Sequence, residues 1–329
     1  SGSLSESQSG SLSGSQPDSQ PESLSESQSE SQRQRVAITG ASGLIGSALS
    51  AFLRARGDDV VHLVRREPQT PSEVRWEPAL RKLDHRALSG LTAVVHLAGA
   101  GVGDHRWSPA YKKEILDSRV NGTATIATAL AELGEPIALV SGSAVGAYGD
   151  RGDELLTEDS ERGKGFLADV VHAWEAATAP AQEAGLSVVH ARTGIVLSSE
   201  GGAMGPVLPL ARLGLAGPLG SGKQYWSWIT LHDELRAIAH LIDHKITGTA
   251  NLVSIEPMRQ KDVMKALGAR LGRPAVLPAP ALALKLALGE FATDILGSQR
   301  ALPSVLTASG FVFEHDTIES AMNWLVPRA

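Results

Sequence analysis

A glycine-rich turn between a strand and a helix constrains this chain most. The apolar, β-branched run 35–39 leads into Thr39-Gly40-Ala41-Ser42-Gly43-Leu44-Ile45-Gly46, and an apolar helical pattern follows over 48–56. Gly40 lets the chain turn sharply, Gly43 lets a pyrophosphate approach the backbone, and Gly46 lets the helix pack close to the strand. Because such a turn presents backbone N–H groups at a helix N-terminus, it predicts nucleotide binding. The alternative is an ordinary glycine-rich turn.

Strands and helices are expected to alternate through most of the chain. Apolar runs predict strands at 60–64, 93–98, 137–140, 187–191 and 250–254. Helical patterns lie at 109–133, 167–184 and 232–243. Apolar strands separated by amphipathic helices are typical of a parallel sheet that is covered on both faces. We therefore predict an α/β protein with a Rossmann-type, doubly wound parallel sheet.

Composition divides the chain into three parts. Residues 1–34 are rich in Ser, Gln, Glu and Gly, so we expect a disordered, low-complexity tail. The nucleotide-binding domain is expected over 35–195, with 229–255 returning to it. After Gly194, glycine and proline pairs interrupt the alternation, and the last segments are mainly helical. Residues 196–228 and 256–329 are therefore expected to form a smaller, mainly helical C-terminal substrate lobe.

Charge and composition argue against several classes of protein. The net charge of −6 offers no basic surface for nucleic acid. No apolar run approaches the about 18–20 residues of a membrane span, and no cationic and then apolar leader is visible. Cysteine is absent, and no His, Asp and Glu set has metal-ligand spacing, so no metal is expected. We expect a cytoplasmic protein with a small-molecule substrate and with neither a nucleic-acid nor a membrane partner.

Two arginines at the end of the second strand indicate which nucleotide binds. An acid at this place reads a free ribose 2′-hydroxyl, whereas an arginine accommodates a 2′-phosphate. Here the strand ends in Arg65 and Arg66, and the first acid is Glu67. Guanidinium groups suit a phosphate dianion, so the sequence favours NADP over NAD. The alternative is a pair of solvated arginines at a strand end.

Further motifs accompany the glycine turn. They are His96-Leu97-Ala98-Gly99, Asp117-Ser118-Arg119, Ser141-Gly142-Ser143, Tyr148-Gly149, Trp174-Glu175, Arg192-Thr193-Gly194-Ile195 and Gly220-Ser221-Gly222-Lys223-Gln224. With them, residues 35–329 resemble the extended short-chain dehydrogenase/reductase superfamily. More narrowly, they resemble its atypical epimerase-family branch, which is nucleoside-diphosphate-sugar epimerase-like and carries a C-terminal domain of unknown function. The resemblance implies a Rossmann core, bound NADP(H) and a small C-terminal lobe.

The resemblance also implies which residues contact the cofactor. Matched position by position, they are Gly40, Ser42, Gly43, Leu44, Ile45, Gly46, Arg65, Arg66, Leu97, Ala98, Gly99, Glu114, Arg119 and Ile195. Leu97 to Gly99 end a strand at the carboxyl edge of the sheet, where cofactors lie in open α/β folds. Glu114 and Arg119 could equally be surface charges, and Ile195 could be a buried strand residue.

The catalytic pattern of the superfamily is missing. Its reductases and epimerases use Tyr-x-x-x-Lys on the helix after the serine strand, where the lysine lowers the pKa of the tyrosine. Counting back from Glu175 places Leu167 and Val171 at these two positions, and neither can move a proton. Ser143 and Tyr148 are the remaining catalytic candidates. Each could instead be structural, Ser143 in a strand-end turn and Tyr148 in packing.

Two functions stay open. The first is an NADP(H)-binding oxidoreductase or epimerase-like enzyme that acts on an unknown small polar or sugar-like substrate, with Tyr148, Ser143 or water transferring the proton. The second is a non-catalytic NADP(H)-binding regulatory or scaffold protein, which the missing Tyr-x-x-x-Lys favours. The segment with Lys223, Trp226 and Trp228 favours the enzyme, since tryptophans can stack on a ring-shaped ligand, although they can also anchor a core.

Overall fold

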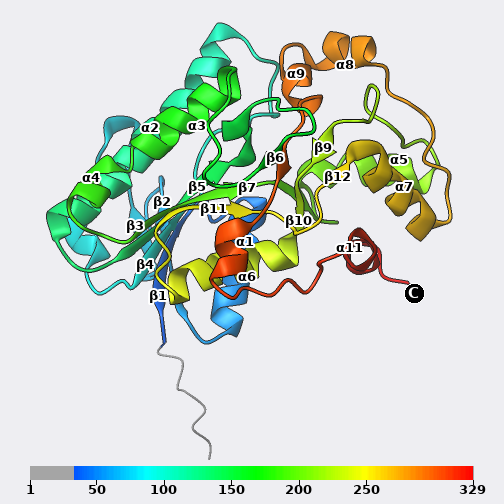
Figure 1. Ribbon diagram of the computed structural model, residues 1–329. Helices are drawn as coiled ribbons and strands as arrows, with labels where there is room; N and C mark the ends of the chain where they lie inside the picture. The colour runs from blue at the N-terminus through cyan, green and yellow to red at the C-terminus, as the bar shows by residue number, and fades with distance from the viewer. Residues whose placement is uncertain (1–32, 329) are drawn as a thin grey trace, which may run out of the picture. The chain divides into compact units, whose positions relative to one another are not determined.

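A seven-stranded parallel sheet is the centre of the fold (Figure 1). The structure, a computed structural model, describes residues 33–328, so nearly all of the expected tail lies outside the described residues. The strand order is β11–β7–β5–β4–β1–β2–β3. The strands are β1 (Arg35–Thr39), β2 (Asp59–Val64), β3 (Glu73–Arg75), β4 (Ala93–His96), β5 (Ala138–Ala144), β7 (Val188–Thr193) and β11 (Gly248–Leu252).

Helices cover both faces of this sheet. The strands are buried on both sides because successive side chains point to opposite faces. In β1, Val36 and Ile38 pack in the core that α1 (Leu44–Ala55) and α6 (Leu231–Asp243) complete. Ala37 packs in the opposite core, beneath α2 (Pro109–Leu133) and α4 (Ala179–Glu183). The prediction of a Rossmann-type, doubly wound α/β fold is confirmed.

The strand order reverses between β1 and β4, which are neighbours in the sheet. The chain leaves β1 through α1 in one direction and leaves β4 through α2 in the other. At such a reversal the loops at the carboxyl ends of the two strands diverge and leave a crevice, where ligands bind in open α/β sheets. The glycine turn that follows β1 lies at this crevice.

Shorter elements build the C-terminal part. Three two-stranded sheets join β6 (Leu155–Leu156) to β13 (Arg300–Ala301), β8 (Ile195–Leu197) to β10 (Trp228–Thr230), and β9 (Tyr225–Trp226) to β12 (Met258–Arg259). The helices are α5 (Val207–Arg212), α7 (Gln260–Leu271), α8 (Ala281–Leu288), α9 (Phe291–Ile295), α10 (Ser304–Ala308) and α11 (Ile318–Leu325). A separate apolar core lies among α5, α7 and α11, while β11 pairs with β7 in the main sheet. The boundaries of the two lobes stay a prediction.

Two elements differ from the sequence prediction. The helix expected over 167–184 is divided into α3 (Phe166–Ala176) and α4, because the Thr178 hydroxyl donates to the Glu175 carbonyl and Pro180 has no N–H to continue the ladder. The short edge strand β3 was not expected, since three residues give no readable alternation. Among the helices of the described residues, none has the length and apolar character needed to cross a membrane.

Candidate functional site

A cleft of about 1150 Å³ opens over the carboxyl ends of β1, β2 and β4. Five segments line it: the glycine turn, the end of β2 with the edge strand, the residues after that strand (Trp76, Pro78 and Ala79), the loop after β4, and one face of α2. The cleft therefore occupies the crevice that the strand order creates. Its lining includes nine of the predicted cofactor residues, namely Gly40, Ser42, Gly43, Arg65, Arg66, Leu97, Ala98, Gly99 and Glu114.

The glycine turn holds bare backbone at the N-terminus of α1. Gly40 has a φ of 68°, and a Cβ on it would lie 2.9 Å from the backbone nitrogen of Ala98. A Cβ on Gly46 would overlap the carbonyl oxygen of Gly40, so α1 can pack this closely only with glycine there. The N-cap residue Gly43 offers no side-chain acceptor, and the first turn of α1 has no acidic residue. The N–H groups of this turn can therefore bind an anion.

A buried hydroxyl–imidazole pair fixes the floor of the cleft. The Thr39 hydroxyl oxygen accepts hydrogen bonds from the backbone N–H groups of Leu97 (3.0 Å) and Ala98 (3.1 Å). Its own proton is then free to be donated to Nδ1 of His96, 2.7 Å away, which assigns the imidazole proton to Nε2. Burial lowers the pKa of His96 to about 4, so the ring is neutral at physiological pH. His96 acts as a structural acceptor and ties β1 to the loop after β4.

Arg65 and Arg66 both lie at the β2 end of the cleft, but only Arg66 is paired with an acid among the described residues. Arg66 donates to both carboxylate oxygens of Glu73, over 2.9 and 2.6 Å, and to the carbonyl of Glu67. Hydrogen bonds from Arg66 and from the Gln69 backbone lower the pKa of Glu73 to about 2. Within residues 33–328 the Arg65 guanidinium makes no hydrogen bond to a protein group. The sequence did not reveal Glu73, because it lies on the unexpected strand β3.

The α2 wall of the cleft carries Glu114, Asp117, Ser118 and Asn121. Their spacing of three, four and seven residues places them on one helix face, a signal that was readable in the sequence. Arg119 points elsewhere: it packs behind Gly99 and donates to the Ala100 carbonyl over 2.8 Å. Burial lowers the pKa of Arg119 to about 10. Leu44, Ile45, Gly46 and Ile195 also do not line the cleft, although the first three begin α1 at its edge.

A buried polar network lies at the end of β5. The Ser143 hydroxyl donates to the Glu175 carboxylate over 2.6 Å, and Arg192 donates to both oxygens of that carboxylate over 2.8 and 2.9 Å. Burial alone would raise the pKa of Glu175, but the hydrogen bonds from Arg192 and Ser143 hold it below its usual value. Glu175 is therefore an ionised acceptor. The proton of Ser143 points at it, and the serine oxygen keeps its capacity to accept a hydrogen bond, although the side chain is buried and lines neither cleft.

The other catalytic candidate is enclosed. Tyr148 has no exposed surface, and its hydroxyl donates to Oδ1 of Asn251 over 2.8 Å. Burial raises the pKa of Tyr148, so its hydroxyl is even less able to lose its proton and act as a base. The positions of the superfamily's tyrosine and lysine, Leu167 and Val171, lie on α3 with Val171 buried. Within residues 138–176, all of which the structure describes, no exposed phenol lies beside an amine.

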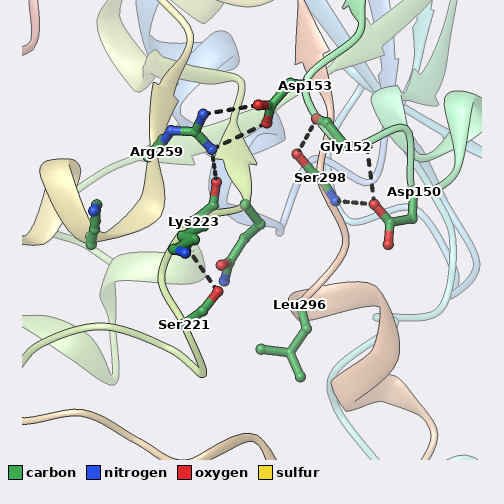
Figure 2. Close-up of a pocket in the computed structure, with 10 residues that line it drawn as sticks. Asp150, Gly152, Asp153, Ser221, Lys223, Arg259, Leu296 and Ser298 are labelled. Atoms are coloured by element: carbon green, nitrogen blue, oxygen red, sulfur yellow. Dashed lines mark hydrogen bonds and ion pairs between the residues drawn. The ribbon is translucent and has the colours of Figure 1, made fainter.

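A second cleft, of about 620 Å³, lies between the loop after Tyr148 and the C-terminal segments (Figure 2). Arg259 reaches both carboxylate oxygens of Asp153 over 3.1 Å, and the backbone N–H of Ser298 donates to Asp150 over 3.1 Å. Lys223 also lines this cleft. Trp226 and Trp228 do not line this cleft. Both are buried, and the Trp228 indole N–H donates to the carbonyl of Glu256. They anchor the core, which was the alternative to ligand stacking.

Comparisons with known proteins agree with this geometry. The sequence model described as the NAD dependent epimerase/dehydratase family matches residues 36–253. The chain belongs to this family. A domain of unknown function, DUF1731, matches residues 279–325, as the predicted resemblance to an atypical epimerase-family branch requires. Within residues 33–328, no group of three or more His, Asp or Glu side chains could hold a metal ion.

Relatives match along nearly the whole chain. An epimerase family protein of Mycobacterium bovis is 43% identical over 295 residues, which cover 89% of this chain and 98% of that protein. The epimerase family protein SDR39U1 of Bos taurus is 34% identical and covers 89% of this chain and 99% of that protein. The crystal structure of human SDR39U1 with NADPH superposes with a TM-score of 0.80 at 32% identity, covering 88% of this chain and 98% of that one.

Proposed function

We propose that this protein binds NADP(H) in the cleft over the carboxyl ends of β1, β2 and β4. The observation that carries the proposal is the pair of anion-binding features in one cleft: the uncapped N-terminus of α1 at the glycine turn, and Arg65 and Arg66 at the end of β2. The first suits a pyrophosphate and the second suits a ribose 2′-phosphate. The crystal structure of human SDR39U1 with NADPH supports the same choice of cofactor.

Arg66 can still bind a phosphate although it is paired with Glu73. The Glu73 carboxylate accepts one hydrogen from each terminal nitrogen of the guanidinium, and the Glu67 carbonyl accepts the second hydrogen of Nη1. The Nε–H and one Nη2–H remain, and these two form the side edge that can bind a phosphate in a bidentate manner. Arg65 adds a guanidinium with no protein acceptor within residues 33–328.

A titration with both reduced cofactors tests this proposal. We expect NADPH to bind far more tightly than NADH. The Arg65→Gln variant should lose about tenfold or more of its affinity for NADPH and almost none for NADH, because a charge-assisted hydrogen bond contributes about 1.5–3 kcal/mol. Arg86→Gln, which removes an exposed arginine that pairs with Asp84, is the matched control. Equal affinity for the two cofactors would contradict the proposal.

We further propose that the cofactor serves an oxidoreductase or epimerase-like reaction on a small polar or sugar-like substrate. The bound nicotinamide supplies or accepts hydride. Ser143 is the group of this chain best suited to a substrate hydroxyl, since its own proton already points at the ionised Glu175 and its oxygen can accept another. Water supplies the remaining proton transfer, because Tyr148 is enclosed.

A non-catalytic, NADP(H)-binding regulatory or scaffold protein is the second candidate. Leu167 and Val171 favour it, as they stand where the superfamily has its proton relay. Stereospecifically deuterated NADPH, offered with a panel of carbonyl and sugar-nucleotide compounds, separates the two. Deuterium in a product, reduced in Ser143→Ala, supports the enzyme. Tight cofactor binding with no deuterium in any product supports the scaffold.

A further inference from the structure

The exposed aliphatic side chains of this protein concentrate in one part of the chain. Of eleven large apolar residues that are exposed, seven lie in two short segments, 207–215 and 274–288. They are Leu210, Leu213, Leu215, Val276, Leu277, Leu282 and Leu286, and their exposure ranges from 47% to 77%. Single exposed leucines are ordinary, but a concentration of this kind marks an interaction surface.

The segments that carry these residues lie side by side. The backbone N–H of Gly220 donates to the carbonyl of Ala279, and the N–H of Ala279 donates to the carbonyl of Pro218, both over 2.8 Å. The loop after α5 thus pairs with the loop that enters α8. Figure 1 shows α5 beside α7, and the chain from α7 leading on to α8. Helix α8 itself has no buried residue, and its Leu282 and Leu286 are both 70% exposed.

The same segments contain basic residues and no acid. Between residues 201 and 232 and between 263 and 289 there are Arg212, Lys223, Lys265, Arg270, Arg273 and Lys285, and no Asp or Glu at all. The whole chain has more acids than bases, 36 against 30. Arg212, Arg273 and Lys285 are exposed, and each lies within three residues of an exposed aliphatic residue along the chain. We call these three cations and the seven aliphatic residues the basic apolar surface.

We propose that the basic apolar surface docks on an anionic lipid bilayer. Aliphatic side chains that enter the headgroup region, with Arg and Lys beside them, are the two components of interfacial membrane binding. Long basic side chains can bury their stems in this region and keep their charge at the headgroups. The expectation of no membrane partner came only from the lack of a membrane-length apolar run, which does not report on binding at the bilayer surface.

Two observations favour a bilayer over a protein. A symmetric dimer through this surface would place the same cations against themselves, because a two-fold interface pairs a patch with its own copy. The seven apolar residues are all aliphatic, whereas protein-binding hot spots are enriched in Trp and Tyr. An aliphatic surface whose own segments, 201–232 and 263–289, carry bases and no acid is complementary to negatively charged headgroups.

Vesicle co-sedimentation of the full chain tests this inference. We expect binding to phosphatidylcholine vesicles that contain phosphatidylserine, little binding to phosphatidylcholine alone, and release at about 1 M salt, where the Debye length is about 3 Å. The triple variant R212Q/R273Q/K285Q should lose about fivefold in partitioning for each cation removed. The triple variant L213Q/V276Q/L286Q should lose binding even at low salt.

A matched control removes exposed apolar residues from other parts of the molecule. The variant L155Q/I255Q/V312Q should partition like the unmodified protein. NADPH affinity, measured on every variant, reports whether the fold is intact and is independent of vesicle binding. No binding to anionic vesicles, or equal loss in the control, would overturn the inference. So would self-association that the L213Q/V276Q/L286Q variant abolishes, since the surface would then bind a second copy.

Discussion

Two strand–loop–helix units of the same sheet, β1 to α1 and β5 to α3, differ in whether they present backbone or side chains. The β1 unit presents backbone: Gly40, Gly43 and Gly46 keep side chains out, residues 40–43 line the cleft, and α1 begins at its edge. The β5 unit presents side chains that are already hydrogen-bonded, Ser143 to Glu175 within the unit and Tyr148 to Asn251 of β11. A backbone site leaves a sterically required pattern in the sequence. The properties of a side-chain site depend on which neighbouring groups hydrogen-bond to each side chain.

Replacing Gly46 by alanine should have the largest effect. A Cβ there would overlap the carbonyl oxygen of Gly40, which is backbone and cannot rotate away, so α1 must move off β1. We expect a loss of stability of about 3 kcal/mol and loss of NADPH binding. Chemical denaturation and cofactor titration measure the two effects.

The matched control lies in the β5 unit. A Cβ on Gly146 would meet only the Leu167 Cβ, at 3.8 Å, which is ordinary contact. Gly146→Ala should therefore change stability by less than about 1 kcal/mol and leave NADPH affinity unchanged. Normal NADPH binding by Gly46→Ala would show that the close packing of α1 on β1 is not what builds the cleft.

Replacing Glu175 by glutamine should have the next largest effect. It removes the carboxylate that pairs with the largely buried guanidinium of Arg192, and a buried charge without its partner costs about 3 kcal/mol or more. Glu154→Gln breaks the more exposed pair with Arg151 and should cost less than about 1 kcal/mol. Equal, small losses in urea denaturation would show that the network at β5 is not the structural centre of that unit.

The contrast between the units explains what the sequence could predict. The glycine turn, the strands and α2 followed from periodicity and sterics, and α2 has the predicted bounds Pro109–Leu133. The placing of Glu73 against Arg66 could not be predicted, because it depends on a three-residue edge strand pairing with β2. The enclosure of Tyr148 was also hidden, since Asn251 lies 103 residues away in the chain.

Two buried glutamates extend the comparison to pH. Glu175 is ionised beside Arg192, whereas burial raises the pKa of Glu234 to about 8, with a hydrogen bond from Thr193 opposing the shift. The native state therefore holds a proton on Glu234 that the unfolded state, with a pKa near 4.5, releases. Between these two values stability must fall as the pH rises, and above about 8 this contribution levels off.

The Glu234→Gln variant isolates this contribution. The amide keeps the shape of the side chain and cannot ionise, so its stability should vary less between pH 5 and pH 8. At pH 8 we expect it to exceed the unmodified protein by on the order of 2 kcal/mol. Glu183→Gln, at an exposed position of α4, should retain the original pH dependence. Parallel stability curves for Glu234→Gln and the unmodified protein would show that Glu234 is ionised in the folded state.

Replacing Tyr148 by phenylalanine should have the smallest effect and bears most directly on the β5 unit. The variant leaves Oδ1 of Asn251 without its donor, which costs about 1–2 kcal/mol, and keeps the ring on which Arg192 stacks at 5.0 Å. Because the hydroxyl is enclosed, deuteride transfer from labelled NADPH should persist in Tyr148→Phe and fall in Ser143→Ala. Loss of transfer in a folded Tyr148→Phe protein would mean that the tyrosine reaches the substrate, and that the β5 unit retains a proton donor despite Leu167 and Val171.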